Sequence, residues 1–173
     1  MQINKLSVAS HSTLNFELDP VRPITVFYGR YASAALNLIN ELICSHSSFE
    51  AAGGPLGGRF IIHADIEDGG KEYSVCYIRN AESVGDCRIG VNFKPASTEF
   101  SREDTVEFLK KRDAVYHEGA FPDFLYWQNG THDPSVIADY VTRLATSGRQ
   151  VFLAVPDGTP AVDLPGVLNV TLD

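Results

Sequence analysis

Ile24-Thr25-Val26-Phe27-Tyr28-Gly29-Arg30-Tyr31-Ala32-Ser33-Ala34-Ala35-Leu36 is the stretch of the chain that decides the fold. Residues 24–28 are a continuous run of β-formers, which is typical of a buried central strand. Gly29 ends this run, and from Ser33 onward the apolar residues recur at helical spacing, at Ala35, Leu38, Ile39, Leu42 and Ile43. The stretch therefore predicts a strand, a tight loop and a helix in succession over residues 24–45.

The segments on either side of this stretch show two different patterns. Strand patterns at Ile3, Leu6 and Val8 and at Leu14, Phe16 and Leu18 predict an antiparallel hairpin. Alternation over residues 60–68, the turn signal Asp68-Gly69-Gly70, a returning strand over 73–79 and a further strand near 88–93 predict a β meander. The last third of the chain instead alternates between helical and strand patterns. Its predicted elements are a helix over 101–116, a buried strand over 124–127, a helix from Pro134 to Gly148, a buried strand over 151–155 and an edge strand over 167–172.

Three of the predicted strands, over residues 24–28, 124–127 and 151–155, are expected to form a parallel core. In the helix over 101–116, Ser101 is expected to cap the first turn, with apolar contacts supplied by Val106, Phe108 and Leu109. Together with the meander and the flanking helices, these elements predict a single mixed α/β domain that spans residues 1–173.

The composition limits the classes of partner. The chain has 173 residues, of which 44% are hydrophobic and 21% are charged, as in an ordinary globular protein. Its formal net charge of -8 argues against nucleic acid and anionic membrane surfaces, because both attract basic patches. The sequence has no run of about 18 apolar residues, and its three cysteines form no C-x-x-C pair. These features predict a cytoplasmic protein that binds neither nucleic acid nor a membrane.

The opening of the chain and its first buried strand carry a resemblance. In the pattern I-x-x-L-x-I-x-N-F … I-x-V-x-Y-G-x-N-G-S-G-K-S, Met1–Leu6 and Leu14–Leu18 stand for the first part and Ile24–Gly29 for the strand before the phosphate loop. The chain resembles, at low identity, the nucleotide-binding head of ABC-type ATPases, especially the heads of structural-maintenance-of-chromosomes and recombination proteins. The resemblance implies a P-loop NTPase-like mixed sheet, with parallel core strands, an antiparallel meander and flanking helices.

The phosphate loop of this family, G-x-x-G-x-G-K-[ST], falls on eight residues that keep only its first glycine: Gly29, Arg30, Tyr31, Ala32, Ser33, Ala34, Ala35 and Leu36. Ala35 replaces the lysine that neutralises the outer phosphates, and Leu36 replaces the hydroxyl that holds magnesium. If Ala32 and Ala34 took the left-handed conformation open to glycine, each would cost about 1–2 kcal/mol. The resemblance therefore makes residues 29–36 a vestigial phosphate loop.

At the positions of the family's other motifs, most of the functional side chains are likewise replaced. Gln128 and Asn129 stand where the Asp and Glu of the Walker B motif organise magnesium and polarise the attacking water. An amide keeps the shape of a carboxylate but has neither its charge nor its basicity. Pro156 replaces the switch histidine, while Thr131–Pro134 resembles the family's loop after the Walker B strand and keeps its aspartate. The resemblance therefore implies that hydrolysis is lost.

The sequence favours a non-catalytic pseudo-ATPase head without a cofactor, acting as a protein-interaction or regulatory module. Its expected partner is an unidentified protein or a second copy of the chain, which meets the former nucleotide face near residues 47–58 and 128–133. One alternative is a residual ATP- and Mg²⁺-binding protein or weak ATPase in which Arg30 and Ser33 contact the phosphates.

A second alternative is a small metalloenzyme that uses His63 and Asp65, because an H-x-D pattern on a strand can supply two ligands of a non-haem iron site. The same pattern, with Glu67, is also the solvent face expected of a strand whose opposite face carries Phe60, Ile62, Ala64 and Ile66. The sequence favours the interpretation of these residues as a solvent face over that of a metal site.

Overall fold

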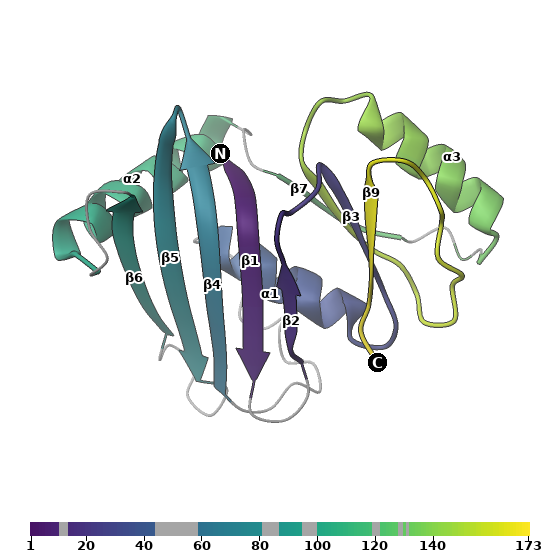
Figure 1. Cartoon of the computed structure of the whole chain (residues 1–173), viewed down its shortest axis with the longest axis horizontal. Coiled ribbons are helices and arrows are strands. Elements are labelled where there is room, and N and C mark those ends of the chain that lie inside the picture. The colour runs from purple at the N-terminus through teal and green to yellow at the C-terminus, as the bar shows by residue number, and fades with distance from the viewer. Residues whose placement is uncertain are drawn as a thin grey trace. The chain divides into compact units, whose positions relative to one another are not determined.

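The computed structural model describes residues 1–10, 14–43, 59–80, 87–94, 100–118, 122–127, 130 and 132–173. The chain divides into two compact units, the first made of residues 1–20 and 40–121 and the second of residues 21–39 and 122–173 (Figure 1). The expectation of one domain over residues 1–173 stays a prediction. The helices and strands confirm a mixed α/β chain. The described antiparallel and parallel strands lie in two separate sheets, so the expected single mixed sheet is not found.

The first unit contains a five-stranded antiparallel sheet in the order β2-β1-β4-β5-β6. Its strands are β1 (Gln2–Ser10), β2 (Phe16–Leu18), β4 (Arg59–Asp68), β5 (Lys71–Asn80) and β6 (Cys87–Lys94). The predicted hairpin and meander are thus confirmed, and the meander turns at the predicted glycines, where Gly69 and Gly70 both have positive φ. Because β1 pairs with both β2 and β4, the hairpin and the meander form one sheet.

One face of this sheet carries the core of the first unit. Phe60, Ile62, Ala64 and Ile66 are buried, as the alternation predicts. The helix α2 (Arg102–Glu118) lies against the sheet, and the ring centroids of its Phe108 and of Tyr73 on β5 are 5.6 Å apart (Figure 1).

The start of α2 follows the prediction, but one of its expected core contacts does not. The Oγ of Ser101 accepts a hydrogen bond of 2.9 Å from the N–H of Asp104, which confirms the predicted cap. Phe108 is buried and Leu109 is half-buried, whereas Val106 is 44% exposed. Two residues correspond to about 200° around a helix, so Val106 faces away from the side that Phe108 buries. The predicted apolar contact of Val106 was therefore wrong.

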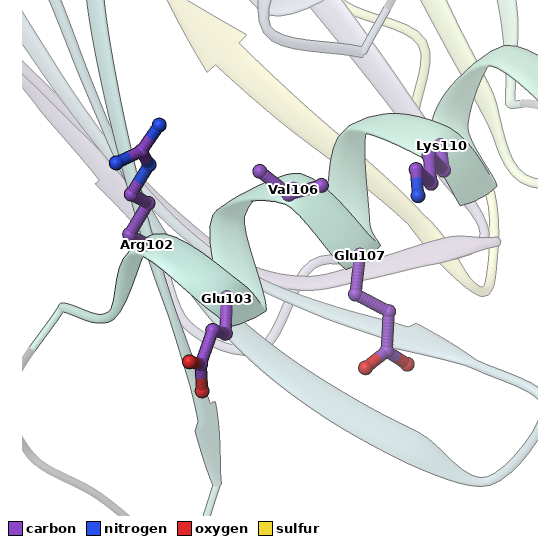
Figure 2. Close-up of a pocket in the computed structure, with 5 residues that line it drawn as sticks. All are labelled: Arg102, Glu103, Val106, Glu107 and Lys110. Carbon is purple, nitrogen blue, oxygen red and sulfur yellow. The ribbon is translucent and has the colours of Figure 1, made fainter.

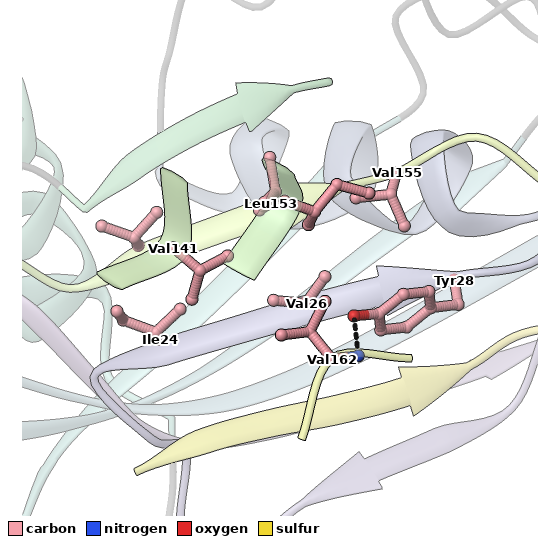
Figure 3. Packing of buried hydrophobic residues seen from close by; sticks show 9 residues of the cluster. Ile24, Val26, Tyr28, Val141, Leu153, Val155 and Val162 are labelled. Carbon is pink, nitrogen blue, oxygen red and sulfur yellow. Dashed lines mark hydrogen bonds between the residues drawn. The ribbon is translucent and has the colours of Figure 1, made fainter. Parts of the chain in front are cut away.

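The second unit contains a four-stranded parallel sheet in the order β7-β8-β3-β9. Its strands are β3 (Ile24–Tyr28), β7 (Asp123–Tyr126), β8 (Val151–Ala154) and β9 (Val167–Thr171). The predicted parallel core is confirmed, and β9 lies at the edge as expected. The helix α3 (Pro134–Ala145) covers one face of the sheet through Ile137 and Val141, which pack in a cluster with Ile24, Val26 and Leu153 (Figure 3).

The opposite face of the parallel sheet carries a row of aromatic rings. Phe152 on β8 stacks between Phe124 and Phe27, with centroid distances of 5.5 and 6.4 Å. Phe124 belongs to β7, which the sequence predicts to be buried. In the structure β7 is half-buried, and its Tyr126 is 39% exposed, because β8 lies between β7 and β3 and β7 forms the end of the sheet. The apolar run of β7 thus belongs to an edge strand.

The helix α1 (Ala32–Ile43) follows β3, as predicted, and its residues 32–39 belong to the second unit. Its predicted apolar residues Ala35, Leu38, Ile39 and Leu42 are buried, and Leu36 is buried as well. Within the part of the chain that the structure describes, no helix combines the length and apolar character needed to span a membrane.

Candidate functional site

The carboxyl ends of β3, β7 and β8 lie at one edge of the parallel sheet, because the three strands run in the same direction. In open α/β sheets, ligands bind at the carboxyl edge, where the loops after the strands meet. Three sequence-predicted features belong to this edge: the turn after Tyr28, the segment after Tyr126 and the segment after Ala154. The residues after β3 are those on which the resemblance places a vestigial phosphate loop.

The turn after β3 is short and closed. The helix α1 begins at Ala32, so the turn between strand and helix consists of residues 29–31. The N–H of Tyr31 donates to the carbonyl oxygen of Leu172 at 3.1 Å, and the N–H of Ala32 donates to the carbonyl oxygen of Gly29 at 3.1 Å. Two N–H groups that an open phosphate loop would turn toward an anion are therefore bonded to carbonyl oxygens of the protein.

Gly29 is the residue of this turn that must be glycine. Its φ is +88°, a left-handed conformation that side chains with a Cβ rarely adopt. A Cβ built on Gly29 would lie 2.4 Å from the carbonyl oxygen of Leu172 and 2.5 Å from Oδ1 of Asp173. Since the N–H of Leu172 also donates to the carbonyl oxygen of Tyr28 at 2.9 Å, the segment after β9 is fixed directly over the turn.

The remaining residues of the vestigial loop form the first turns of α1. None of the described non-glycine residues has a positive φ, so Ala32 and Ala34 avoid the strain that a left-handed position would impose. Ala35 and Leu36, which stand where the resemblance places the lysine and the magnesium-binding hydroxyl, are both 0% exposed. Side chains at these two positions therefore point into the protein core and do not face a ligand at the edge of the sheet.

The polar groups of the loop that do reach the surface are few. Arg30 and Ser33 are exposed, and the guanidinium carbon of Arg30 lies 4.6 Å above the ring centroid of Tyr31. A cation above an aromatic face is attracted by the quadrupole of the ring. The Arg30 guanidinium is thus a surface group stacked on Tyr31.

The last residue of β7 contacts α1, and Asp133 caps α3. The Tyr126 hydroxyl donates to Oδ1 of Asn37 on α1, and burial raises the pKa of that hydroxyl. Gln128 and Asn129, on which the resemblance places the Walker B carboxylates, lie outside the described residues. Asp133 caps α3 by accepting hydrogen bonds from the Ser135 hydroxyl at 2.8 Å and the Ser135 N–H at 2.9 Å, and these bonds lower the pKa of its carboxyl. The side chain of Asp133 therefore stabilises a helix.

The segment after β8 continues the sheet and then turns. The N–H of Val155 donates to the carbonyl oxygen of Phe27 at 3.0 Å, and Pro156 follows. A proline side chain has no donor or acceptor, so it cannot sense a phosphate as a histidine would. The imidazole Nδ1 of His132 lies 3.0 Å from the Oγ1 of Thr159, which ties the start of α3 to the loop after β8.

Two contacts at this edge have no clear signal in the sequence. The first is the cover that Leu172 and Asp173 form over Gly29. The second is a hydrogen bond of 3.0 Å from the N–H of Val162 to the buried hydroxyl of Tyr28, whose pKa is raised by burial (Figure 3). Both join segments far apart in the chain, and local patterns do not encode such pairs.

The residues of the metalloenzyme alternative lie in the first unit. His63 is exposed and its Nε2 lies 3.9 Å from the Sγ of Cys76, which is its paired residue on β5. Burial raises the pKa of the Cys76 thiol. Among the described residues, His63, Asp65 and Glu67 do not join any group of three or more side chains able to hold a metal ion. The prediction that the opposite face of this strand is the core face is confirmed.

A hollow of about 540 Å³ lies along α2 in the first unit (Figure 2). Its described lining comes from one helix and mixes both signs of charge: Arg102, Glu103, Val106, Glu107 and Lys110. The Glu107 carboxylate is already bonded to the ammonium of Lys71 at 3.1 Å and the hydroxyl of Tyr73 at 3.2 Å, and these contacts lower its pKa. The bonds of Glu107 therefore attach α2 to the β4–β5 hairpin.

No protein-family model and no curated protein matches the chain significantly.

Proposed function

We propose that the chain is a non-catalytic head of ABC-type ATPase architecture that acts as a protein-interaction or regulatory module. A P-loop NTPase-like arrangement is supported by the order of the elements. The strand before the vestigial loop and the strand before Gln128 lie in one parallel sheet, and an antiparallel meander precedes the second of them. The turn into α1 starts at the carboxyl end of β3, where a phosphate loop would start.

The observation that most strongly supports the absence of nucleotide binding is the closed turn at residues 29–31. A working loop holds phosphates with free N–H groups, a lysine and a hydroxyl on magnesium. In this chain the N–H of Tyr31 is bonded to Leu172, and the positions of the lysine and the hydroxyl are fully buried at Ala35 and Leu36. All three means of holding a phosphate are therefore missing together.

The acidic and switch motifs support the same conclusion. Phosphoryl transfer needs a metal ion between the phosphates and a group that orients the nucleophile. Gln128 and Asn129 supply neither charge nor basicity. Asp133 is engaged as the cap of α3, and Pro156 has no group that can reach a phosphate.

A role in protein contact is supported by the side chains that the sheet edge exposes. Tyr126 is more than one third exposed, and Arg30 is exposed above Tyr31. Tyrosine and arginine are enriched among the residues that dominate protein interfaces. A dimer through the carboxyl edge of the parallel sheet would depend on such side chains, because this edge has no binding site for the nucleotide that joins working heads.

Isothermal titration calorimetry with ATP and Mg²⁺ tests the proposal. We expect no saturable heat at micromolar protein, and the same flat trace when EDTA replaces Mg²⁺. Saturable micromolar binding that EDTA abolishes would overturn the proposal and favour a residual ATP-binding protein that uses Arg30 and Ser33. A concentration series in analytical ultracentrifugation then separates self-association from the binding of another protein.

A further inference from the structure

The strand β9 forms one end of the parallel sheet, and its outer edge has no partner strand among the described residues. The N–H of Leu172, directly after β9, donates to the Tyr28 carbonyl oxygen on β3 at 2.9 Å. Because backbone groups alternate in direction along a strand, the N–H and C=O groups of Asn169 and Thr171 point away from β3. Both residues are exposed, and Nδ2 of Asn169 donates to the Val162 carbonyl oxygen at 2.9 Å. The outer edge therefore presents backbone donors and acceptors that can pair with another strand.

The other sheet ends carry features that discourage pairing with another chain. Such features are short length, charged residues and proline. β2 has three residues, and its Glu17 pairs with Lys5 at 3.2 Å. On β7, Asp123 pairs with Arg149 at 3.0 Å, and the sequence of β6 contains an arginine and a lysine. The five residues of β9 include no charged residue, proline or glycine, so β9 is the described edge best suited to accept another strand.

A second copy of β9 fits this edge when the two strands run antiparallel about a two-fold axis through Asn169. In that register the two Asn169 residues exchange both N–H···O=C bonds, and each Thr171 N–H meets the Val167 carbonyl oxygen of the second copy. Leu168 lies opposite Val170 of the second copy. Both of these side chains are half-buried in one copy, so their pairing buries further apolar surface. The backbone and the side chains of β9 are therefore self-complementary in the same register.

We propose that the chain forms a two-fold homodimer in which two β9 strands pair and join the two parallel sheets into one continuous sheet. Two-fold contacts are the commonest in soluble oligomers, and this one covers the open edge in both copies. Pairing of two five-residue strands is a small contact, so we expect a weak dimer that forms at high micromolar to millimolar protein. The inference goes beyond the proposed function, because it concerns the β9 edge and holds whether or not nucleotide binds.

Proline at position 169 tests the contact, because the N–H of Asn169 points to the outer edge and not to β3. Proline lacks an N–H and is tolerated where the N–H of an edge strand faces solvent. Asn169→Pro removes one donor from each copy, and two hydrogen bonds of ordinary net strength correspond to about tenfold in a dissociation constant. We therefore expect the dimer to weaken by about tenfold or more. Asn169→Ala is the matched control, because it also loses the bond to Val162 but keeps the N–H, so it should dimerise like wild type.

Sedimentation velocity over a concentration series measures the dimerisation of wild type, Asn169→Pro and Asn169→Ala. Amide exchange of the ¹⁵N-labelled proteins then identifies the surface. In wild type the amides of Asn169 and Thr171 should be protected only at high concentration, whereas those of Leu168 and Val170, which face β3, should be protected throughout. The amide spectrum also shows whether each variant is folded. A second variant, Thr171→Pro, removes the outer pair of bonds and should weaken the dimer as well.

The inference is supported if wild type and Asn169→Ala dimerise, the Asn169 amide of wild type gains protection with concentration, and the proline variants weaken the dimer. It is overturned if wild type is a monomer at millimolar concentration, or if its Asn169 amide is equally protected at every concentration. It is also overturned if folded proline variants dimerise like wild type, or if Asn169→Ala weakens the dimer as much as Asn169→Pro. If neither proline variant folds, the concentration dependence of the Asn169 amide in wild type decides. The ATP titration that tests the proposed function is independent of these outcomes.

Discussion

Replacing Gly29 with alanine tests the closed turn through stability. The added methyl meets two penalties: a left-handed φ of +88°, and a contact of 2.4 Å with the Leu172 carbonyl oxygen. The left-handed conformation costs an L-residue about 1–2 kcal/mol. To relieve the contact, Leu172 must move and weaken its hydrogen bonds to Tyr28 and Tyr31, at about 0.5–1.5 kcal/mol for each bond. We therefore expect Gly29→Ala to lower the free energy of unfolding by about 2–5 kcal/mol in urea.

Gly158→Ala is the matched control, because it separates the two penalties. Gly158 has a φ of +77°, and a Cβ at this position meets no atom within 4 Å. Gly158→Ala should therefore lower the free energy of unfolding only by the cost of the left-handed conformation, about 1–2 kcal/mol. Equal losses of stability in the two variants, with equal urea dependence, would show that Leu172 does not cover Gly29.

Three further substitutions test other parts of the structure. Tyr28→Phe keeps the ring in the core but leaves the buried N–H of Val162 without its acceptor, so we expect urea denaturation to show a loss of about 1–3 kcal/mol; no loss would contradict that bond. Ala35→Lys introduces a lysine where the resemblance places one, at a position that is fully buried. An unpaired ammonium there costs several kcal/mol, so the melting temperature should fall sharply. Calorimetry should show no gain of ATP binding. The pKa of Glu107 is lowered, mainly by its hydrogen bond to Lys71, so the carboxylate contributes to stability above pH 4.5 and this contribution is lost as the pH falls below that value. Glu107→Gln should therefore flatten this part of the acid unfolding curve. An unchanged curve would contradict the contact between Glu107 and Lys71.

The elements of the fold could be predicted from the sequence because hydrophobic period follows local geometry. Strict alternation located β4, and the continuous apolar runs located β3 and β8. The burial of β7 could not be predicted in the same way. An apolar run of four residues looks alike in a central strand and in an edge strand that packs aromatic rings, and strand order decides between the two.

The residue types at the candidate site could be read from the sequence, but the closed turn could not. The sequence places Ala35 and Leu36 where a lysine and a hydroxyl would be needed, and the structure adds that both positions are buried. The cover over Gly29 depends on a segment at the far end of the sequence, brought there by the parallel pairing of β9 with β3. Local hydrophobic periodicity indicates where a strand lies, but it does not specify which distant strand it pairs with.

Hydrogen exchange at the amide of Tyr31 tests the closed turn most directly, measured in wild type with and without Mg²⁺-ATP. The bond to the Leu172 carbonyl oxygen predicts that this amide is protected without nucleotide. We expect the same protection after nucleotide is added, because the closed turn has no free N–H groups that could bind a phosphate. Fast exchange that becomes slow when Mg²⁺-ATP is added would instead show an open loop that closes on nucleotide.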